Sequence, residues 1–170
     1  MKLLKVFIII SGFAFFSCQS GNRNIVFNEK ANQDILYGYA TPEVFLSEPF
    51  AVWYDKEYSN YETNSLLVDS LTQQIADITI TIVLGTWCPD CRREVPRFIK
   101  VLNSINFPLE HLTIVGVDRG KVCPKANVRE GEIEFVPTFI IFKKGEELGR
   151  IIESPTLSFE EDLLRILVGS

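Results

Sequence analysis

Short apolar runs separated by polar turns predict the strands of this chain of 170 residues. Residues 78–84 are almost entirely β-branched or apolar, which predicts a central strand covered on both faces. Residues 112–117 and 138–142 have the same pattern and predict two further buried strands. The turn 143–147 follows the second of these, and residues 148–152 complete a predicted β-hairpin.

Apolar residues spaced three and four apart predict helices around those strands. An amphipathic helix begins at Asn64 or the next residue, and Leu66 and Leu71 belong to its apolar face. A second helix follows residues 78–84 and extends to about Ile105. Ser158 opens a C-terminal helix through a capping box. This order predicts an α/β fold with a mixed central sheet and helices on both faces.

The first 24 residues have the pattern of an export signal. Two lysines lie among the first five residues, and an apolar run over residues 6–16 follows them. That run is too short to span a bilayer but suits a signal peptide over residues 1–17. Cys18 comes directly after the small residue Ser17, which resembles the lipobox of bacterial lipoproteins. We therefore expect lipid on Cys18 and a tether over residues 18–24, with ordinary secretion as the alternative.

Composition and charge narrow the function classes. The formal net charge is -5, and removal of residues 1–17 leaves 15 basic against 22 acidic residues, or -7. This balance lacks the basic footprint of a nucleic-acid-binding protein.

The aromatic residues between Phe45 and Tyr61 are expected to pack in the core, with a substrate surface as the alternative. Thr41 and Pro42 have the pattern of a helix start.

The residues between the central strand and the next helix carry candidate chemistry. Cys88 and Cys91 are three positions apart, and Pro89 suits the first turn of a helix. A helix N-terminus stabilises a thiolate, which is the nucleophile in thiol–disulfide exchange. Cys88 is therefore the predicted attacking sulfur, and Cys91 the sulfur that resolves the mixed disulfide. Trp87 is expected to shield the pair and to contact substrate.

Motifs on both sides of these cysteines resemble the thioredoxin superfamily. The Trp-Cys-x-x-Cys pattern is followed by Pro96, and Val136-Pro137 precedes a predicted strand. The stretches 85–88 and 91–96 look like the TlpA/ResA group of membrane-anchored bacterial thioredoxins. The resemblance implies a thioredoxin-like three-layer fold over residues 65–170, with residues 25–64 as an N-terminal extension packed on it. It also implies a cis Pro137 and a Val136 backbone that pairs with substrate.

The sequence differs from thioredoxin itself in the central strand. Thioredoxin has a buried Asp six residues before the first cysteine, and Ile82 stands at that position here. In the TlpA/ResA group a Glu three residues after the second cysteine looks like the replacement, and Glu94 matches it. The hypothesis is that Glu94 is a partly buried general base whose pKa is raised by desolvation. The alternative is a surface glutamate.

The predicted function is thiol–disulfide exchange on protein substrates, without a cofactor. Asp90 opposes a thiolate on Cys88, whereas Arg92 and Arg93 favour one, so the charges leave the direction of exchange open. The group resemblance favours a reductant that a membrane electron donor keeps reduced. The expected location is the bacterial cell envelope, with a lipid anchor, facing the periplasm.

Two alternatives belong to other classes. Cys123, Cys88, Cys91 and His111 have the ligand count of a zinc site, although a second Cys-x-x-Cys or a histidine pair is missing. The prediction favours no metal, with Cys123 as a half-buried inert thiol and His111 as a structural or solvated residue. A second resolving thiol is the alternative for Cys123. The whole chain is alternatively a non-catalytic binding module.

Overall fold

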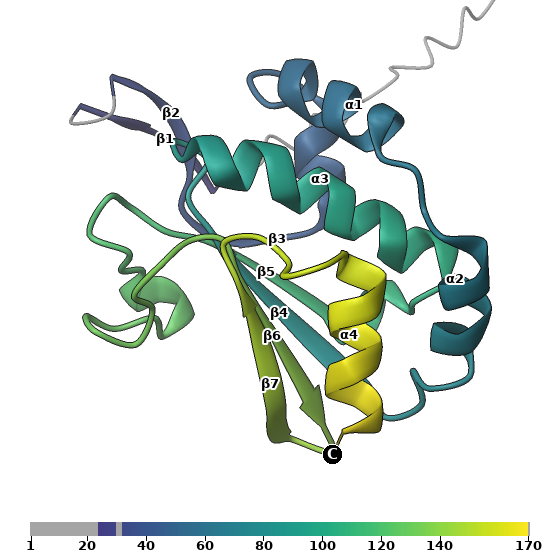
Figure 1. Cartoon of the computed structure of the whole chain (residues 1–170). Helices are drawn as coiled ribbons and strands as arrows, with labels where there is room; N and C mark the ends of the chain where they lie inside the picture. Colours follow the sequence, from purple (N-terminus) through teal and green to yellow (C-terminus); the bar gives the residue numbers. More distant parts are fainter. Residues whose placement is uncertain (1–23, 30–31, 170) are drawn as a thin grey trace, which may run out of the picture.

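A five-stranded mixed sheet forms the centre of the molecule (Figure 1). The computed structural model describes residues 24–29 and 32–169. Along the sheet the strands are, in order, β3 (Gly38–Ala40), β5 (Leu112–Gly116), β4 (Ile78–Leu84), β6 (Thr138–Lys143) and β7 (Glu146–Ile152). Strands β4 and β5 are parallel, and the other neighbouring pairs are antiparallel. The predicted mixed sheet with residues 78–84 at its centre is confirmed.

The two faces of β4 have different surroundings. Ile78, Ile80 and Ile82 face the helices and are at most 1% exposed. On the opposite face Val83 is buried, but Thr79 is exposed. The expectation that both faces of this strand are covered is therefore wrong at its N-terminal end. Thr79 tolerates exposure because its hydroxyl can bond to water.

The four α-helices of the described residues lie on one side of the sheet, as Figure 1 shows. They are α1 (Ala51–Asn60), α2 (Ser65–Thr72), α3 (Pro89–Ser104) and α4 (Phe159–Val168). Helix α1 packs on α3 and α2 packs on α4. On the other side of the sheet, the helical layer consists of one turn of 3-10 helix, η3 (Pro124–Ala126), within the connection between β5 and β6. The predicted second helical layer is thus reduced to η3.

Side-chain caps start two of these helices where the sequence predicts them. The Asn64 side chain accepts hydrogen bonds from the backbone N–H groups of Leu66 and Leu67. Ser158 Oγ accepts one from the Glu161 N–H at 3.1 Å. Helix α2 ends at Thr72, however, and Leu66 is 78% exposed. The prediction that Leu66 lies on the buried face is therefore wrong. In a helix of eight residues, only a narrow stripe of side chains packs against α4.

Residues 25–64 contribute to the same sheet and core. Strands β1 (Ile25–Asn28) and β2 (Gln33–Leu36) form a hairpin, and β3 pairs with β5 at the edge of the main sheet. A short 3-10 helix, η1 (Pro42–Leu46), begins where Thr41 and Pro42 predict a helix. The aromatic side chains of this region that are buried, as expected of core residues, are Phe45, Phe50 and Tyr54. The boundary at residue 64 remains a prediction.

The membrane-related predictions fall mostly outside the described residues. Cys18, the signal peptide 1–17 and the tether up to residue 23 are not among them. Within residues 24–29 and 32–169, every helix is too short or too polar to cross a bilayer.

A further 3-10 turn, η2 (Leu109–His111), leads into β5.

Candidate active site

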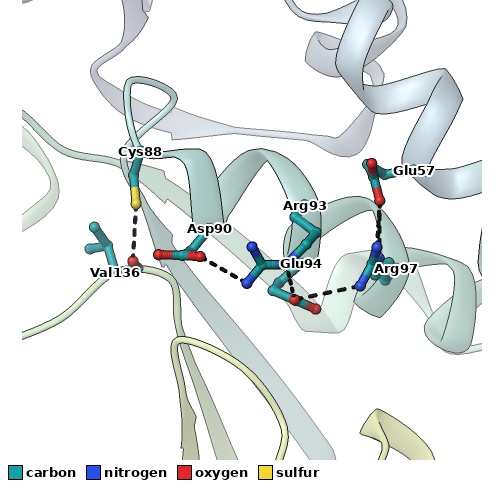
Figure 2. Close-up of polar contacts among 7 residues, drawn as sticks. All are labelled: Glu57, Cys88, Asp90, Arg93, Glu94, Arg97 and Val136. Atoms are coloured by element: carbon teal, nitrogen blue, oxygen red, sulfur yellow. Dashed lines mark hydrogen bonds and ion pairs between the residues drawn. The ribbon is translucent and has the colours of Figure 1, made fainter.

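The two cysteines lie where β4 passes into α3. Strand β4 ends at Leu84, Cys88 is the N-cap residue of α3, and Pro89 is its first residue. Proline suits this position because its fixed φ matches the helix and the first N–H groups have no partner within the helix. The Cys88 N–H donates to the Gly85 carbonyl at 2.8 Å, which closes the turn before the helix. Figure 2 shows Cys88 at this end of α3 with its sulfur directed toward Val136.

The surroundings of Cys88 favour its thiolate. The pKa of Cys88 is lowered to about 6, chiefly by a hydrogen bond from the Cys91 side chain and also by the backbone N–H groups of Cys91 and Asp90. Burial and the negative charge of Asp90 act in the opposite direction. In its thiol form, Cys88 donates to the Val136 carbonyl at 3.4 Å. A lowered pKa together with a position at a helix N-terminus is the environment of an attacking sulfur.

The surroundings of Cys91 favour its protonated form. Its side chain is fully buried, and the Gly85 N–H donates to its sulfur at 3.3 Å. Burial raises the pKa of Cys91 well above its usual range, with smaller contributions from Cys88 and Asp90. The two cysteines therefore differ in the way that exchange requires: Cys88 favours the thiolate and is 9% exposed, whereas Cys91 favours the thiol and is fully buried.

Trp87 packs across the loop that carries Cys88. Its indole N–H donates to the Val117 carbonyl at 3.0 Å, and the Arg119 guanidinium lies 5.3 Å from the ring centroid. A Cβ atom on Gly85 would lie 2.4 Å from the ring. Glycine at this position therefore leaves the space that the indole occupies. The predicted role of Trp87 in contacting substrate remains a prediction.

The loop before β6 brings Val136 and Pro137 to the cysteines. The Val136–Pro137 bond is cis, as the resemblance to thioredoxins implies. The Val136 carbonyl accepts the hydrogen bond from Cys88, and the Pro137 carbonyl accepts one from the Glu153 N–H at 2.7 Å. The two predicted site segments are thus adjacent although they lie 48 residues apart. Pairing of the Val136 backbone with substrate remains a prediction.

Glu94 is buried, but its carboxylate contacts arginines. It is 4% exposed, so the alternative of a surface glutamate is wrong. Its Oε1 atom lies 2.6 Å from Arg93 Nε and 3.6 Å from Arg97 Nη1, and Arg97 also binds Glu57 of α1 (Figure 2). Burial, Cys88 and Asp90 raise the pKa of Cys91, and none of these effects involves Glu94. The role of Glu94 as a general base remains a prediction.

The two arginines after Cys91 have different partners. Arg92 Nε donates to the Thr86 carbonyl at 2.7 Å, and its Nη2 donates to Gln33 of β2 at 2.9 Å. Arg93 Nη2 instead binds the Asp90 carboxylate at 2.8 Å. Sequence reasoning gives no signal for Gln33, because it is 59 residues from Arg92. Arg93 partly offsets the charge that opposes the Cys88 thiolate.

We expect the Asp90→Asn substitution to lower the Cys88 pKa, because the carboxylate opposes the thiolate. Arg93→Gln should raise it by leaving that charge unpaired. Asp90 and Arg93 are 40% and 42% exposed, so each change is worth about a twofold shift in the ionisation equilibrium. Thiolate absorbance against pH measures both. Asp69→Asn on α2 is the control, and a raised Cys88 pKa in Asp90→Asn would contradict the assignment.

The zinc alternative does not fit the structure. Cys123 is fully buried rather than half-buried. His111 precedes β5, whereas Cys88 follows β4, and these parallel strands place the two residues toward opposite ends of the sheet. The five paired positions from Ile80 to Leu84 alone span about 13 Å. Among the described residues, no group of three or more His, Cys, Asp or Glu side chains is placed to hold a metal ion.

The fold and this dithiol site define a thiol–disulfide oxidoreductase of the thioredoxin type. The thioredoxin family model matches residues 62–163, and the chain belongs to that family. It is 28% identical over 92 residues to putative thioredoxin-5 of Dictyostelium discoideum. That alignment covers 54% of this chain and 84% of that protein. It is 23% identical to thioredoxin H5 of Arabidopsis thaliana over 123 residues, covering 72% of this chain and 89% of that protein.

A solved structure supports the same fold. A protein of unknown function from Pseudomonas aeruginosa superposes with a TM-score of 0.55 at 17% identity. The match covers 78% of this chain and 93% of that protein. This coverage is larger than the part of the chain that the thioredoxin family model matches, residues 62–163. As a member of this family, the chain acts on protein thiols and disulfides.

Proposed function

We propose that this thioredoxin is a membrane-anchored reductant of the TlpA/ResA kind that works in the bacterial cell envelope. The observation that carries the proposal is the contrast between its sulfurs. Cys88 has a pKa of about 6 and is 9% exposed beside Val136, whereas Cys91 is fully buried with a raised pKa. This contrast supports sequential attack by one sulfur and then the other.

The reaction proceeds in two steps. The Cys88 thiolate attacks one sulfur of a substrate disulfide, which forms a Cys88–substrate disulfide and releases the other substrate sulfur as a thiolate. Cys91 then loses its proton and attacks Cys88 Sγ, which releases the second substrate sulfur and leaves a Cys88–Cys91 disulfide. Two electrons pass to the substrate, whose thiolates take up protons. A membrane electron donor returns the pair to its dithiol form.

The Cys88 pKa supports the reducing direction. A stabilised thiolate favours the reduced form of the protein and so makes it a stronger oxidant. The first cysteine has a pKa of about 7 in thioredoxin and about 3.5 in the oxidant DsbA. Cys88, at about 6, lies nearer the thioredoxin value. We therefore expect a reduction potential closer to about -270 mV than to about -120 mV.

The location rests on the N-terminal sequence. Two lysines, an apolar run over residues 6–16 and Cys18 after Ser17 support export and lipid attachment. Ile82 in place of the thioredoxin Asp, together with Glu94 three residues after Cys91, supports the TlpA/ResA kind. One acyl chain binds membranes only weakly, so a stable anchor requires more than one chain on Cys18.

Expression in a bacterium, with Cys18→Ala as the control, tests the location. We expect palmitate label and membrane fractionation for the wild type and neither for the variant. Alkylation of the cells before lysis tests the direction by separating dithiol from disulfide, and we expect the dithiol. A Cys88–Cys91 pair held as the disulfide, with a potential near -120 mV, would identify an oxidant instead. If the wild type and the Cys18→Ala variant were found in the membrane fraction to the same extent, Cys18 would not anchor the protein.

A further inference from the structure

A pocket lies beside Phe135, the residue before Val136. Its volume is about 320 Å³, and it lies between the connection to β6 and the end of β7. The lining residues that matter here are Glu132, Glu134, Phe135, Arg150, Ile152 and Glu153. Phe135 directly precedes Val136, so the pocket continues from the backbone that contacts Cys88.

Two exposed apolar side chains line this pocket. Phe135 is 43% exposed and Ile152 is 50% exposed. Ile152 pairs with Thr138 in the β6–β7 register, and the Thr138 hydroxyl donates to the Phe135 carbonyl at 2.7 Å. Both residues are therefore held next to the start of β6. Exposed apolar surface next to a reacting sulfur indicates a contact with substrate.

The charged groups of the pocket are mainly acidic. Glu132, Glu134 and Glu153 line it, and Arg150 is its one cation. The Arg150 guanidinium is bound at two nitrogen atoms by the Glu147 carboxylate, at 2.5 and 2.9 Å. Its charge is thus largely offset by Glu147. The pocket retains a negative potential that suits a cation.

The pocket also lies close to the reacting sulfur. Cys88 contacts the Val136 carbonyl at 3.4 Å, and the Glu153 N–H donates to the next carbonyl, that of Pro137, at 2.7 Å. The Trp87 ring, by contrast, has a cation beside it, because the Arg119 guanidinium lies 5.3 Å from the ring centroid. A cationic substrate side chain is therefore favoured in the pocket and disfavoured beside the Trp87 ring.

We propose that this pocket is a subsite for a lysine or arginine side chain of the substrate polypeptide, close to its reacting cysteine. The proposal rests on the thiol–disulfide exchange described above. The long aliphatic part of such a side chain covers Phe135 and Ile152, while its charged end reaches Glu134 and Glu153. Both features of the pocket are then used by one residue type.

The test uses short peptides whose cysteine is joined to thionitrobenzoate. Attack by Cys88 on the peptide sulfur releases the coloured thiolate, so its absorbance gives the exchange rate. Lysine, norleucine, alanine or glutamate stands two residues before or after the cysteine. We expect the lysine peptide to react about fivefold faster than the glutamate peptide at low salt. This advantage should decrease in concentrated salt, because exposed charges are screened.

Variants of the pocket's glutamates show whether the lysine advantage comes from the pocket or from the overall charge of the protein. The double variant Glu134→Gln, Glu153→Gln should lose most of the lysine advantage. Glu146→Gln, at the far end of the same hairpin, is the matched control and should keep it. Melting curves confirm that the variants are folded.

Three results would overturn the proposal. The first is an equal rate for the lysine and glutamate peptides with the wild type. The second is a lysine advantage that persists in the double variant, and the third concerns the norleucine peptide. A norleucine peptide as fast as the lysine peptide would show an apolar pocket only. Absence of thionitrobenzoate release from every peptide, including alanine, would instead remove the exchange function itself and the subsite with it.

Discussion

Replacing Cys88 with serine is expected to abolish disulfide reduction by this thioredoxin. The serine hydroxyl is not ionised at neutral pH, whereas Cys88 has a pKa of about 6 and is mostly thiolate. Cys91→Ser keeps the attacking sulfur but lacks the resolving one, so it should accumulate Cys88–substrate disulfides. Insulin reduction measures turnover, and mass spectrometry of the trapped species measures the first step.

The third described cysteine provides the control for this experiment. Cys123 is fully buried, so Cys123→Ser should retain wild-type turnover provided that the protein folds. Loss of resolution in that variant would make Cys123 a second resolving thiol. Insulin reduction by Cys88→Ser would assign the attack to another sulfur. Absence of turnover by the wild type would favour a non-catalytic binding module.

The pKa of Cys88 also predicts how attack depends on pH. Only the thiolate reacts, and its fraction falls from about nine tenths at pH 7 to about one tenth at pH 5. Alkylation of Cys88 by iodoacetamide should therefore be nearly constant above pH 7 and should decrease about tenfold per pH unit well below pH 6. A midpoint near the ordinary thiol value would contradict the hydrogen bonds described for Cys88.

Phe98→Ala is expected to cause the largest loss of stability. The Phe98 ring lies 4.5 Å from that of Phe139 and 5.1 Å from that of Phe159, and these last two are 5.2 Å apart. All three side chains are fully buried and join α3, β6 and α4. Truncation loses apolar burial and leaves a cavity, which together cost about 3–5 kcal/mol.

Urea denaturation monitored by circular dichroism measures this change in the free energy of unfolding. Phe27→Ala is the matched control, because it makes the same substitution at a side chain that is 62% exposed. We expect it to change the free energy by less than about 1 kcal/mol. A similar loss in both variants would show that the aromatic cluster does not dominate the core.

The elements with strong local patterns were predictable from the sequence. Strand β4 and helix α3 have long apolar patterns, and Asn64 and Ser158 provide caps whose bonds involve only neighbouring residues. Strand β3 was not predictable in this way. It has three residues, and its partner β5 lies more than 70 positions further along the chain. A strand of this length carries no periodicity of its own.

The partners of charged side chains were the main part of the site that the sequence left open. Asp90, Arg92 and Arg93 lie within four positions, so spacing alone does not assign which charge acts on Cys88. The folded chain directs Arg92 to Gln33 and Arg93 to Asp90. A long, flexible side chain reaches many groups, and only the tertiary structure determines which of them it meets.

The sequence by itself determined the chemistry of this protein: two cysteines three apart at a strand–helix junction, with Val136-Pro137 before a later strand. These features depend on local backbone geometry and on residue type, which the order of amino acids specifies directly. Only the tertiary structure decided the burial that raises the pKa of Cys91 and the acidic pocket beside Val136. Burial and pockets arise from segments distant in sequence, so they exist only once the chain has packed.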